Sequence, residues 1–468
     1  MRLDRLQLAL TGALAGTCLV SVFAAQVLLT LGVVVFFARL ALRRTSFPRL
    51  ATDAPIVAFA VWTLLSASFS ADPLRSHESA KKLVLFLVLY LVADAVRSPA
   101  YRERLIDGVL LGGLVLGAGS LLQYHFLGFD TLHKRPHSFL GHYMTASGLS
   151  MGVLVLATTR LVFRAECSAR PTARDLKALG VLAVALGGLT FLQAAELFAL
   201  EAERLLVAAL ALATGALALS RGPWPGASTQ TLLGGLAAAV SAGALIVSRT
   251  RNAWVGAVAG LAVLALLRAP RTLLLIPVGL LAVLALRPAP IMERLTVFDA
   301  SSRDRYYMWQ AGIDMILDKP VFGQGPNMIF HSYPSYRWPE APNPLTPHLH
   351  DNLLQIAAER GLPCLAWWLW LMAVAFLTAY REAGRPVTPE TWPAAAALAG
   401  LTALMAAGLF EYNFGDSEVL MFTLLLMALP FGLWLQGRSQ LPLAPEGGGA
   451  TADGRSPSST GDEQLQGG

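Results

Sequence analysis

The chain has 468 residues, of which 14% are charged and 55% are hydrophobic, and its formal net charge is +6. A soluble domain carries about 25% charged residues, so this composition excludes a protein whose whole surface faces water. Most of the surface must face lipid instead. The net positive charge is therefore no sign of a nucleic-acid partner, and none is expected.

The N-terminal 25 residues have a basic tip and an apolar run, as a signal peptide does. The apolar stretch continues to Leu42, however, with only Arg39 interrupting it, so we expect a membrane span that is kept. The three cysteines (Cys18, Cys167 and Cys364) lie far apart, and their spacing predicts neither a disulfide framework nor a metal site.

Apolar runs follow one another along most of the chain, and a helix needs about 20 mostly apolar residues to cross a bilayer. Several runs are short, so the sequence predicts an all-α polytopic membrane bundle with 12 to 14 transmembrane helices. The runs are 6–22, 24–42, 54–69, 83–97, 105–125, 143–163, 177–197, 204–220, 231–248, 253–268, 272–287, 362–380, 392–410 and 417–436.

The positions of Lys and Arg predict how these helices are oriented, because short cytoplasmic segments are enriched in both. With the N-terminus in the cytoplasm, 21 of the 36 Lys and Arg residues fall in cytoplasmic segments. About half of the others lie in or beside one long external loop, where the rule has little force. We therefore expect both termini on the cytoplasmic side.

The chain divides into four predicted parts. Residues 1–287 form the N-terminal transmembrane helices, and 288–361 form an external loop, too long for a mere connection, that carries catalytic motifs. Residues 362–437 form the C-terminal transmembrane helices. The tail at 438–468 is rich in Gly, Ser and Pro, which predicts a disordered cytoplasmic segment.

Polar residues gather at the predicted outer ends of the helices, where their position costs free energy. The first group, 134–142, contains Arg135 just before a span. The second, 248–254, places Arg249 and Arg251 in a short outer turn, against the usual charge bias. Either group can also be read as ordinary interfacial residues.

The third group begins at Arg303 and is predicted to be a helix that Pro320 ends. The glycines at 323 and 325 allow close approach of the backbone, although Gly-x-Gly alone is a weak nucleotide motif. The residues with helical spacing are Arg305, Trp309, Gly312, Ile313 and Ile316.

The fourth group is centred on His348, His350 and Asp351, and His350 is predicted to share a helix face with Leu354 and Ala357. A metal site is one interpretation, but no cysteines and no HExxH-type geometry accompany it. A histidine used for proton transfer fits better, since its pKa is close to the working pH. We therefore expect no metal and no cofactor.

A last outer turn, 411–418, holds three acids, among them Glu411 and Asp416. This turn has two interpretations. Its acids are solvated, or they pair with the arginines or hold a polar acceptor. Arginines and a histidine at the outer membrane face suit a lipid that carries a diphosphate, because arginine binds phosphate through two parallel hydrogen bonds. This pattern favours glycosyl transfer from a lipid carrier.

Four segments resemble motifs of the O-antigen ligase and polymerase superfamily, and they occur in the same order. The string SRTRNAWVGAVAGL is similar to the arginine-turn signature of that superfamily, and RPHSFLGHYMTASG to its earlier arginine segment. RYYMWQAGIDMILDKPVFGQGPNMIF resembles its external segment. HDNLLQIAAERGLP resembles its histidine motif, with Asp351 where Asn or Ser is usual. The resemblance covers roughly residues 85–435.

The resemblance implies a metal-independent transferase that uses polyprenyl diphosphate-linked glycans. It assigns diphosphate contacts to Arg135, Arg251 and Arg305, with Arg249 and Arg303 as near alternatives, and a general-base or acceptor-orienting role to His350. Further residues are expected to support the site or hold the acceptor: Trp309, Asp351, Glu411 and Asp416.

The function favoured by these observations is that of a ligase in the bacterial inner membrane, with its active site on the periplasmic face. It would move an undecaprenyl diphosphate-linked polysaccharide onto an outer-leaflet acceptor, with the lipid A core as the expected one. Alternatives are a polymerase of lipid-linked repeat units, a protein O-oligosaccharyltransferase and a glycan transporter or flippase. A transporter predicts charges near the bilayer midplane, whereas here they lie at the outer edge.

Overall fold

The structure is a computed structural model, and it describes residues 2–163, 229–268, 270–274, 281, 285, 300–385, 391–432 and 435. All regular secondary structure in these ranges is helical. Six of the helices there are long and apolar enough to cross a membrane. The prediction of an all-α polytopic membrane protein is therefore confirmed.

The helices of the first part alternate with short turns. α2 begins where the Ser21 side chain accepts a hydrogen bond from the Ala24 amide, and α6 begins with Pro99, a residue suited to the first turn of a helix. The elements are α1 (Arg2–Thr17), α2 (Val22–Ala41), α3 (Asp53–Ser68), α4 (Pro73–Ala80), η1 (Lys81–Phe86), α5 (Leu87–Ala95), α6 (Pro99–Phe126) and α7 (Tyr143–Phe163).

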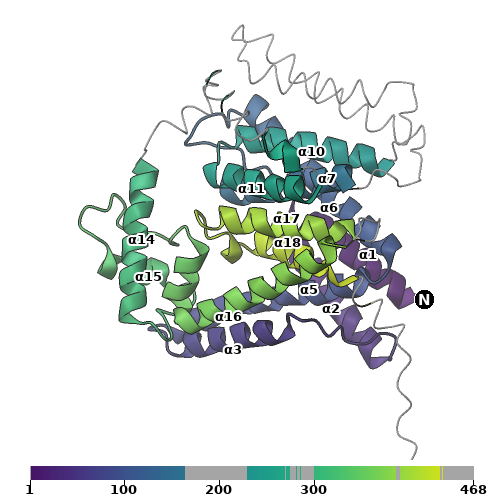
Figure 1. The fold of residues 1–468 in the computed structure, drawn as a ribbon. Helices are drawn as coiled ribbons and strands as arrows, with labels where there is room; N and C mark the ends of the chain where they lie inside the picture. The colour runs from purple at the N-terminus through teal and green to yellow at the C-terminus, as the bar shows by residue number, and fades with distance from the viewer. Residues whose placement is uncertain are drawn as a thin grey trace, which may run out of the picture.

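The later helices complete the bundle and add an element outside it. In Figure 1 the bundle helices run roughly side by side, whereas α14 stands across one end of them. The elements are α10 (Thr229–Val247), α11 (Arg251–Arg268), η2 (Pro270–Leu274), α14 (Ala300–Asp318), α15 (Ile329–Tyr336), α16 (Asn352–Ala383), α17 (Trp392–Ala407), η3 (Asn413–Gly415) and α18 (Ser417–Ala428).

The predicted apolar runs coincide with helices wherever the structure describes them. The run at 83–97 is divided between η1 and α5, and α18 ends at Ala428, before the predicted residue 436. The runs at 177–197 and 204–220, most of 272–287, the start of the external loop and the tail at 438–468 lie outside the described residues. The number of spans stays a prediction.

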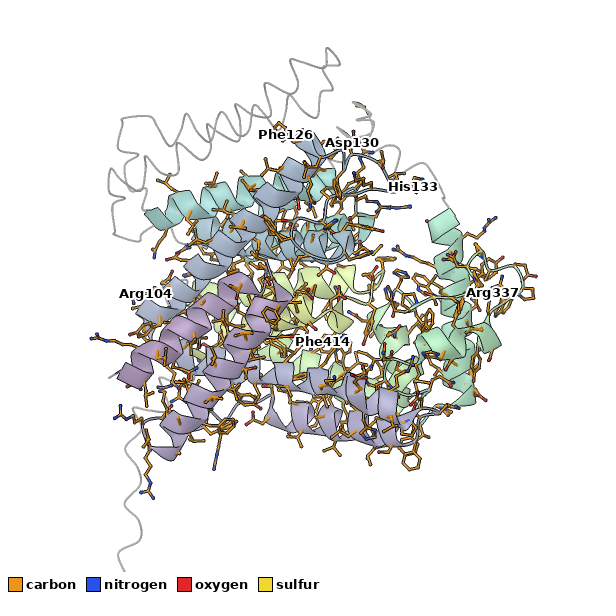
Figure 2. The ribbon with its side chains drawn as sticks, turned by 180° about the vertical axis from the view of Figure 1, so that it is seen from behind. Arg104, Phe126, Asp130, His133, Arg337 and Phe414 are labelled. Carbon is orange, nitrogen blue, oxygen red and sulfur yellow. The ribbon has the colours of Figure 1, made fainter. Side chains whose placement is uncertain are left out.

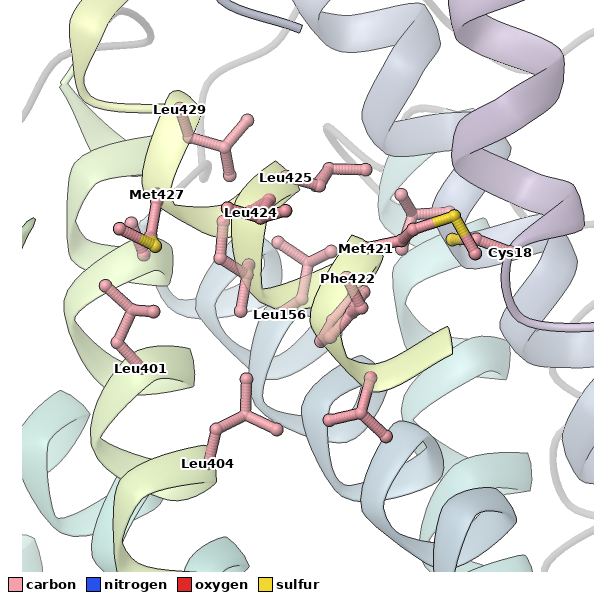
Figure 3. Packing of buried hydrophobic residues seen from close by; sticks show 14 of the residues in the cluster. Cys18, Leu156, Leu401, Leu404, Met421, Phe422, Leu424, Leu425, Met427 and Leu429 are labelled. Carbon is pink, nitrogen blue, oxygen red and sulfur yellow. The ribbon is translucent and has the colours of Figure 1, made fainter. Parts of the chain in front are cut away.

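The core of the bundle lies around α17 and α18, whose side chains are buried almost throughout. Figure 3 shows leucine, methionine and phenylalanine side chains of α18 beside Leu401 and Leu404 of α17 and Leu156 of α7. Because these two helices are covered on all sides, the turn between them, residues 408–416, is held in a fixed place at one end of the bundle.

The external element formed by α14 and α15 has a small apolar core of its own, which includes Met308, Met315, Tyr333 and Leu349. The sequence predicted α14 and its end near Pro320, and both are found. The expectation of a folded element in this loop therefore agrees with the part of the loop that the structure describes.

The Gly-Gln-Gly turn after α14 fastens the external element to the bundle. The amides of Gln324 and Gly325 each donate a 2.8 Å hydrogen bond, to the carbonyl oxygens of Ala358 and Glu359 in α16. Gly323 has a φ of 66°, and a side chain there would overlap the α16 backbone. The close approach that these glycines allow is thus made to protein backbone.

α16 is kinked at Gly361, whose φ of 82° lies outside the helical region. A Cβ on this residue would overlap the carbonyl oxygen of Val321. Trp62 of α3 donates from its indole nitrogen to the carbonyl oxygens of Val321 and Arg360, at 3.3 and 3.1 Å. The kink, the glycine turn and α3 together fix where α14 and the start of α16 lie.

Candidate functional site

Glu411 is the centre of a polar cluster at the end of the bundle that α14 covers. Its side chain is buried, with 7% of the side-chain surface exposed. Its Oε2 lies 2.8 Å from Nδ1 of His350 and 3.8 Å from a guanidinium nitrogen of Arg305, and Oε1 lies 3.7 Å from Nδ1 of His348. Arg305 and the two histidines, from two separate segments, therefore meet at the carboxylate of a third segment.

His350 stands just before α16 and not on it. Its φ of 54° lies in the left-handed region, and the helix begins at Asn352 with Asp351 as its N-cap. The prediction that His350 shares a helix face with Leu354 and Ala357 is therefore wrong. A left-handed residue ahead of the cap turns the chain, and the ring of His350 lies 4.2 Å from that of His348, centre to centre.

Neighbouring residues hold this turn in place. The indole nitrogen of Trp309 donates a 3.1 Å hydrogen bond to the carbonyl oxygen of Leu349, and Oε1 of Gln355 accepts one from the Leu349 amide at 2.7 Å. The predicted supporting role of Trp309 thus has a structural counterpart in this contact. Gln355 was missed, because a glutamine inside a helix carries no distinctive signal.

Asp351 is the N-cap of α16, and its side chain is engaged there and not with His348 and His350. Its Oδ1 accepts a 2.8 Å hydrogen bond from the Leu354 amide. Burial raises the pKa of Asp351, while this bond acts against the rise. Since Asn, Ser and Asp all serve as N-caps, the departure from the family's usual residue at this position keeps the same local geometry.

A pair of asparagines, missed by the sequence analysis, joins the two halves of the cluster. Nδ2 of Asn352 donates to Oδ1 of Asn413 at 2.7 Å, and the Asn352 amide donates to the carbonyl oxygen of Gly408 at 2.8 Å. Both asparagines are buried. They fix the turn that carries Glu411 against the start of α16.

Of the two arginines on α14, only Arg305 faces the cluster. Arg305 is partly buried and lies near Glu411, whereas Arg303 is exposed. The difference follows from the helical spacing, because positions two residues apart point to different sides of a helix.

The loop before α7 approaches the same place. The guanidinium of Arg135 lies over the ring of Tyr143, 4.2 Å from its centre. Oγ1 of Thr145 donates a 2.7 Å hydrogen bond to Oδ2 of Asp416. Burial raises the pKa of Asp416 to about 6. Asp416 is therefore tied to α7 and is not part of the Glu411 cluster.

Arg251 reaches the same end of the bundle through the packing of α11 on α17. A Cβ on Gly256 would lie 2.5 Å from the carbonyl oxygen of Ala403, and one on Gly260 would lie 2.9 Å from that of Ala399. The two helices are thus antiparallel, and at 1.5 Å per residue Arg251 lies about 7 Å beyond Gly256. That is the end at which α17 leads to Glu411. Arg249 precedes α11 with a left-handed φ of 51°.

Residues 236–369 match a family model described as O-antigen ligase. This match supports membership of the O-antigen ligase and polymerase superfamily. The chain is accordingly a membrane protein of the ligase- or polymerase-like glycosyltransferase type. The matched residues include Arg251, Arg305 and His350, whereas Arg135 and Glu411 lie outside them. No curated protein gives a match.

The charge state of the cluster in this O-antigen ligase-like protein follows from its contacts. Burial acts to raise the pKa of Glu411, but the hydrogen bond with His350 and the positive charge that its neighbours can carry, with Arg305 always charged, outweigh it and hold that pKa below its ordinary value. Burial, with the charge of His350, lowers the pKa of His348 to about 4. Near pH 7, Glu411 is therefore ionised and His348 is neutral.

The tautomer of His350 follows from its neighbour. An ionised carboxylate accepts hydrogen bonds only, so Nδ1 of His350 must donate to Glu411. A neutral His350 then carries its lone pair on Nε2. Glu411 and His350 thus correspond to the carboxylate and histidine of a catalytic triad, in which the histidine takes a proton from a hydroxyl group.

His348, His350 and Glu411 also place three potential metal-ligand atoms within 4.8 Å of one another. Two histidines and a glutamate are a known zinc ligand set. Sequence reasoning considered Asp351 as the acidic member and missed Glu411, which lies 61 residues beyond His350 in the chain.

We expect transfer activity of the purified protein to survive EDTA, because Arg305 and the Nδ1 proton of His350 already supply positive charge to Glu411. The measurement is transfer rate before and after chelation, together with metal content by elemental analysis. Activity that is lost with the metal and returns with a divalent ion would instead make these three side chains ligands.

Proposed function

We propose that this protein is an O-antigen ligase that transfers an undecaprenyl diphosphate-linked polysaccharide onto a sugar of the lipid A core. The proposal rests chiefly on the buried Glu411–His350 pair with Arg305 beside it. This combination offers a base for an acceptor hydroxyl and a cation for a diphosphate at one place, at the edge of a membrane bundle.

The proposed reaction has one bond-forming and one bond-breaking event at the anomeric carbon of the donor. Nε2 of His350 takes the proton of the acceptor hydroxyl, and the acceptor oxygen bonds to the anomeric carbon. The bond from that carbon to the diphosphate oxygen breaks, and undecaprenyl diphosphate leaves with the electron pair. Glu411 holds the imidazole in the required tautomer and stabilises the imidazolium that forms.

The arginines are assigned to the leaving group. Guanidinium groups bind phosphate oxygens in pairs of parallel hydrogen bonds and keep their charge at any working pH. Arg305 uses one nitrogen toward Glu411, which leaves its other donors for phosphate. Arg251 and Arg135 extend the positive region at the same end of the bundle. Charge stabilisation of a leaving diphosphate in a partly desolvated site is strong because little water screens it.

The test of this function is the surface polysaccharide of a strain that lacks the protein. A ligase predicts uncapped core together with accumulated lipid-linked long chains. Core capped by a single repeat unit would indicate a polymerase instead, and normal polysaccharide with unmodified glycoproteins would indicate a protein O-oligosaccharyltransferase. Expression of the intact gene should restore the polysaccharide.

The proposed location is the bacterial inner membrane, with α14 and α15 in the periplasm and both termini in the cytoplasm. In a variant without native cysteines, we expect an impermeant thiol reagent added to spheroplasts to label Phe330→Cys on α15. Arg381→Cys, at the opposite end of α16, should react only after the membrane is opened. Both positions are exposed, so the reverse pattern would contradict the orientation.

A further inference from the structure

Two adjoining cavities lie at the end of the bundle opposite Glu411. In Figure 2, Arg104, which lines one of the cavities, lies at one end of the bundle, and His133 and Arg337 lie toward the other. Each cavity has a volume of about 560 Å³, and they share Leu8, Ala95 and Tyr101 in their walls. One continuous hollow therefore opens where α1 and α6 begin and α2 ends.

The hollow lies beside the glycine contacts of α1 and α6, which extend to Gly12: a Cβ on Gly108 would lie 2.9 Å from the carbonyl oxygen of Gly12. A Cβ on Gly16 would lie 2.8 Å from the carbonyl oxygen of Gly108, and one on Gly112 would overlap Gly16. Such small-residue contacts bring membrane helices close together. Nearer the helix starts, a Cβ on Gly12 would meet no atom within 4 Å. Gly12 thus faces open space, between walls formed by Leu8, Ala9, Ala13 and Leu105.

The mouth of the hollow is strongly basic. Six arginines and one acid, Asp94, line the two cavities. Asp94 is already engaged, at 2.6 Å from Arg39 and 3.7 Å from Arg97, and Arg39 is also 2.9 Å from Asp4. The four other arginines are exposed: Arg5, Arg43, Arg44 and Arg104.

Among the described residues, nothing compensates the positive charge of these four arginines. In the ranges that the structure describes, no carboxylate lies within ion-pairing distance of any of them. Arg104 lies beside the ring of Tyr101, 5.5 Å from its centre. An anion that enters the hollow would compensate this charge.

We propose that this hollow binds an anionic glycerophospholipid. The phosphate lies among Arg5, Arg43, Arg44 and Arg104, and an acyl chain lies in the apolar gap between α1 and α6, over Gly12. Basic pockets between helices at the membrane surface bind such headgroups, and each basic residue there contributes about 1 kcal/mol, or about fivefold in affinity. A free phosphate would use the rim alone and leave the apolar gap empty.

The test compares binding of phosphatidylglycerol and phosphatidylcholine to the detergent-purified full chain, by native mass spectrometry and by thermal stability. Phosphatidylglycerol should bind and stabilise the protein more than phosphatidylcholine does. In the variant Arg5→Gln/Arg43→Gln/Arg44→Gln, its affinity should fall on the order of 10²-fold, since three contributions of about fivefold multiply. The control is Arg268→Gln/Arg381→Gln, which removes two exposed arginines from the C-terminal ends of α11 and α16.

The variant Gly12→Leu tests the acyl chain separately from the charges. It should fill the apolar gap without a clash, keep the melting temperature of the lipid-free protein, and abolish the preference for phosphatidylglycerol. The proposal is overturned if Gly12→Leu binds this lipid as the unmodified protein does, or if the control loses as much affinity as the triple variant. It is also overturned if inorganic phosphate or soluble glycerol phosphate binds as tightly as the lipid.

Discussion

Replacing His350 by alanine is expected to lower turnover by a factor on the order of 10²–10⁴, the usual contribution of a positioned acid or base, while donor binding stays near normal. The reason is the geometry around Glu411: its carboxylate lies 2.8 Å from Nδ1 of His350, which leaves Nε2 as the atom that takes the acceptor proton in the proposed reaction. The donor's diphosphate is assigned to the arginines, so loss of the imidazole should leave its affinity intact.

The measurement is donor affinity and single-turnover rate on detergent-purified protein, normalised to the folded fraction. His133→Ala is the matched control, because His133 is an exposed histidine of the loop before α7, and its turnover should be unchanged. Glu411→Gln should lower turnover in the same direction as His350→Ala, since it removes the charge that stabilises the imidazolium. Full turnover in His350→Ala would show that His350 is not the base, and His137 and His142 would be tested next.

Replacing Arg251 by lysine is expected to be almost as harmful as replacing it by alanine. Lysine keeps the charge but loses the paired hydrogen bonds that a guanidinium makes to phosphate. A hydrogen bond to a charged group contributes about 1.5–3 kcal/mol, so we expect donor affinity to fall roughly 10- to 10²-fold in both variants. Turnover should fall as well, because the same contacts stabilise the leaving diphosphate.

The same pair of substitutions at Arg305 should behave alike, whereas Lys319→Ala should not. Lys319 is an exposed cation just after α14, so its removal changes the net charge of this face without touching the cluster. Donor affinity by equilibrium binding to purified protein distinguishes the cases. If Arg251→Lys binds donor normally while Arg251→Ala does not, Arg251 acts as a point charge and the paired contact to the diphosphate is absent.

The candidate site could be predicted only in part, and the reason is distance along the chain. Arg305, which has helical spacing to Trp309, was assigned to the diphosphate with Arg303 as an alternative, and the structure places Arg305 beside Glu411 and leaves Arg303 exposed. His350 was identified from residue type, but its supposed place on a helix was wrong, since a left-handed turn and the N-cap at Asp351 precede α16. A local pattern does not reveal such a turn.

The sequence by itself indicated that this protein lies in a membrane, that it is helical and that its polar residues gather at the ends of the apolar runs. These properties follow from composition and from apolar runs of bilayer length, which are local and additive along the chain. The resemblance to the superfamily, which the match at 236–369 supports, rested instead on four short motifs in a fixed order.

Only the tertiary structure decided which polar residues share a site. Glu411 was one of three acids in an outer turn, and nothing local distinguished it from Asp416. The covering of α17 and α18 on all sides places that turn, and the bond between Asn352 and Asn413 brings it to His350. Asp416 is drawn instead to Thr145. Contacts between residues about 60 or more positions apart depend on helix packing, and helix packing depends on the shapes of all the neighbouring side chains together.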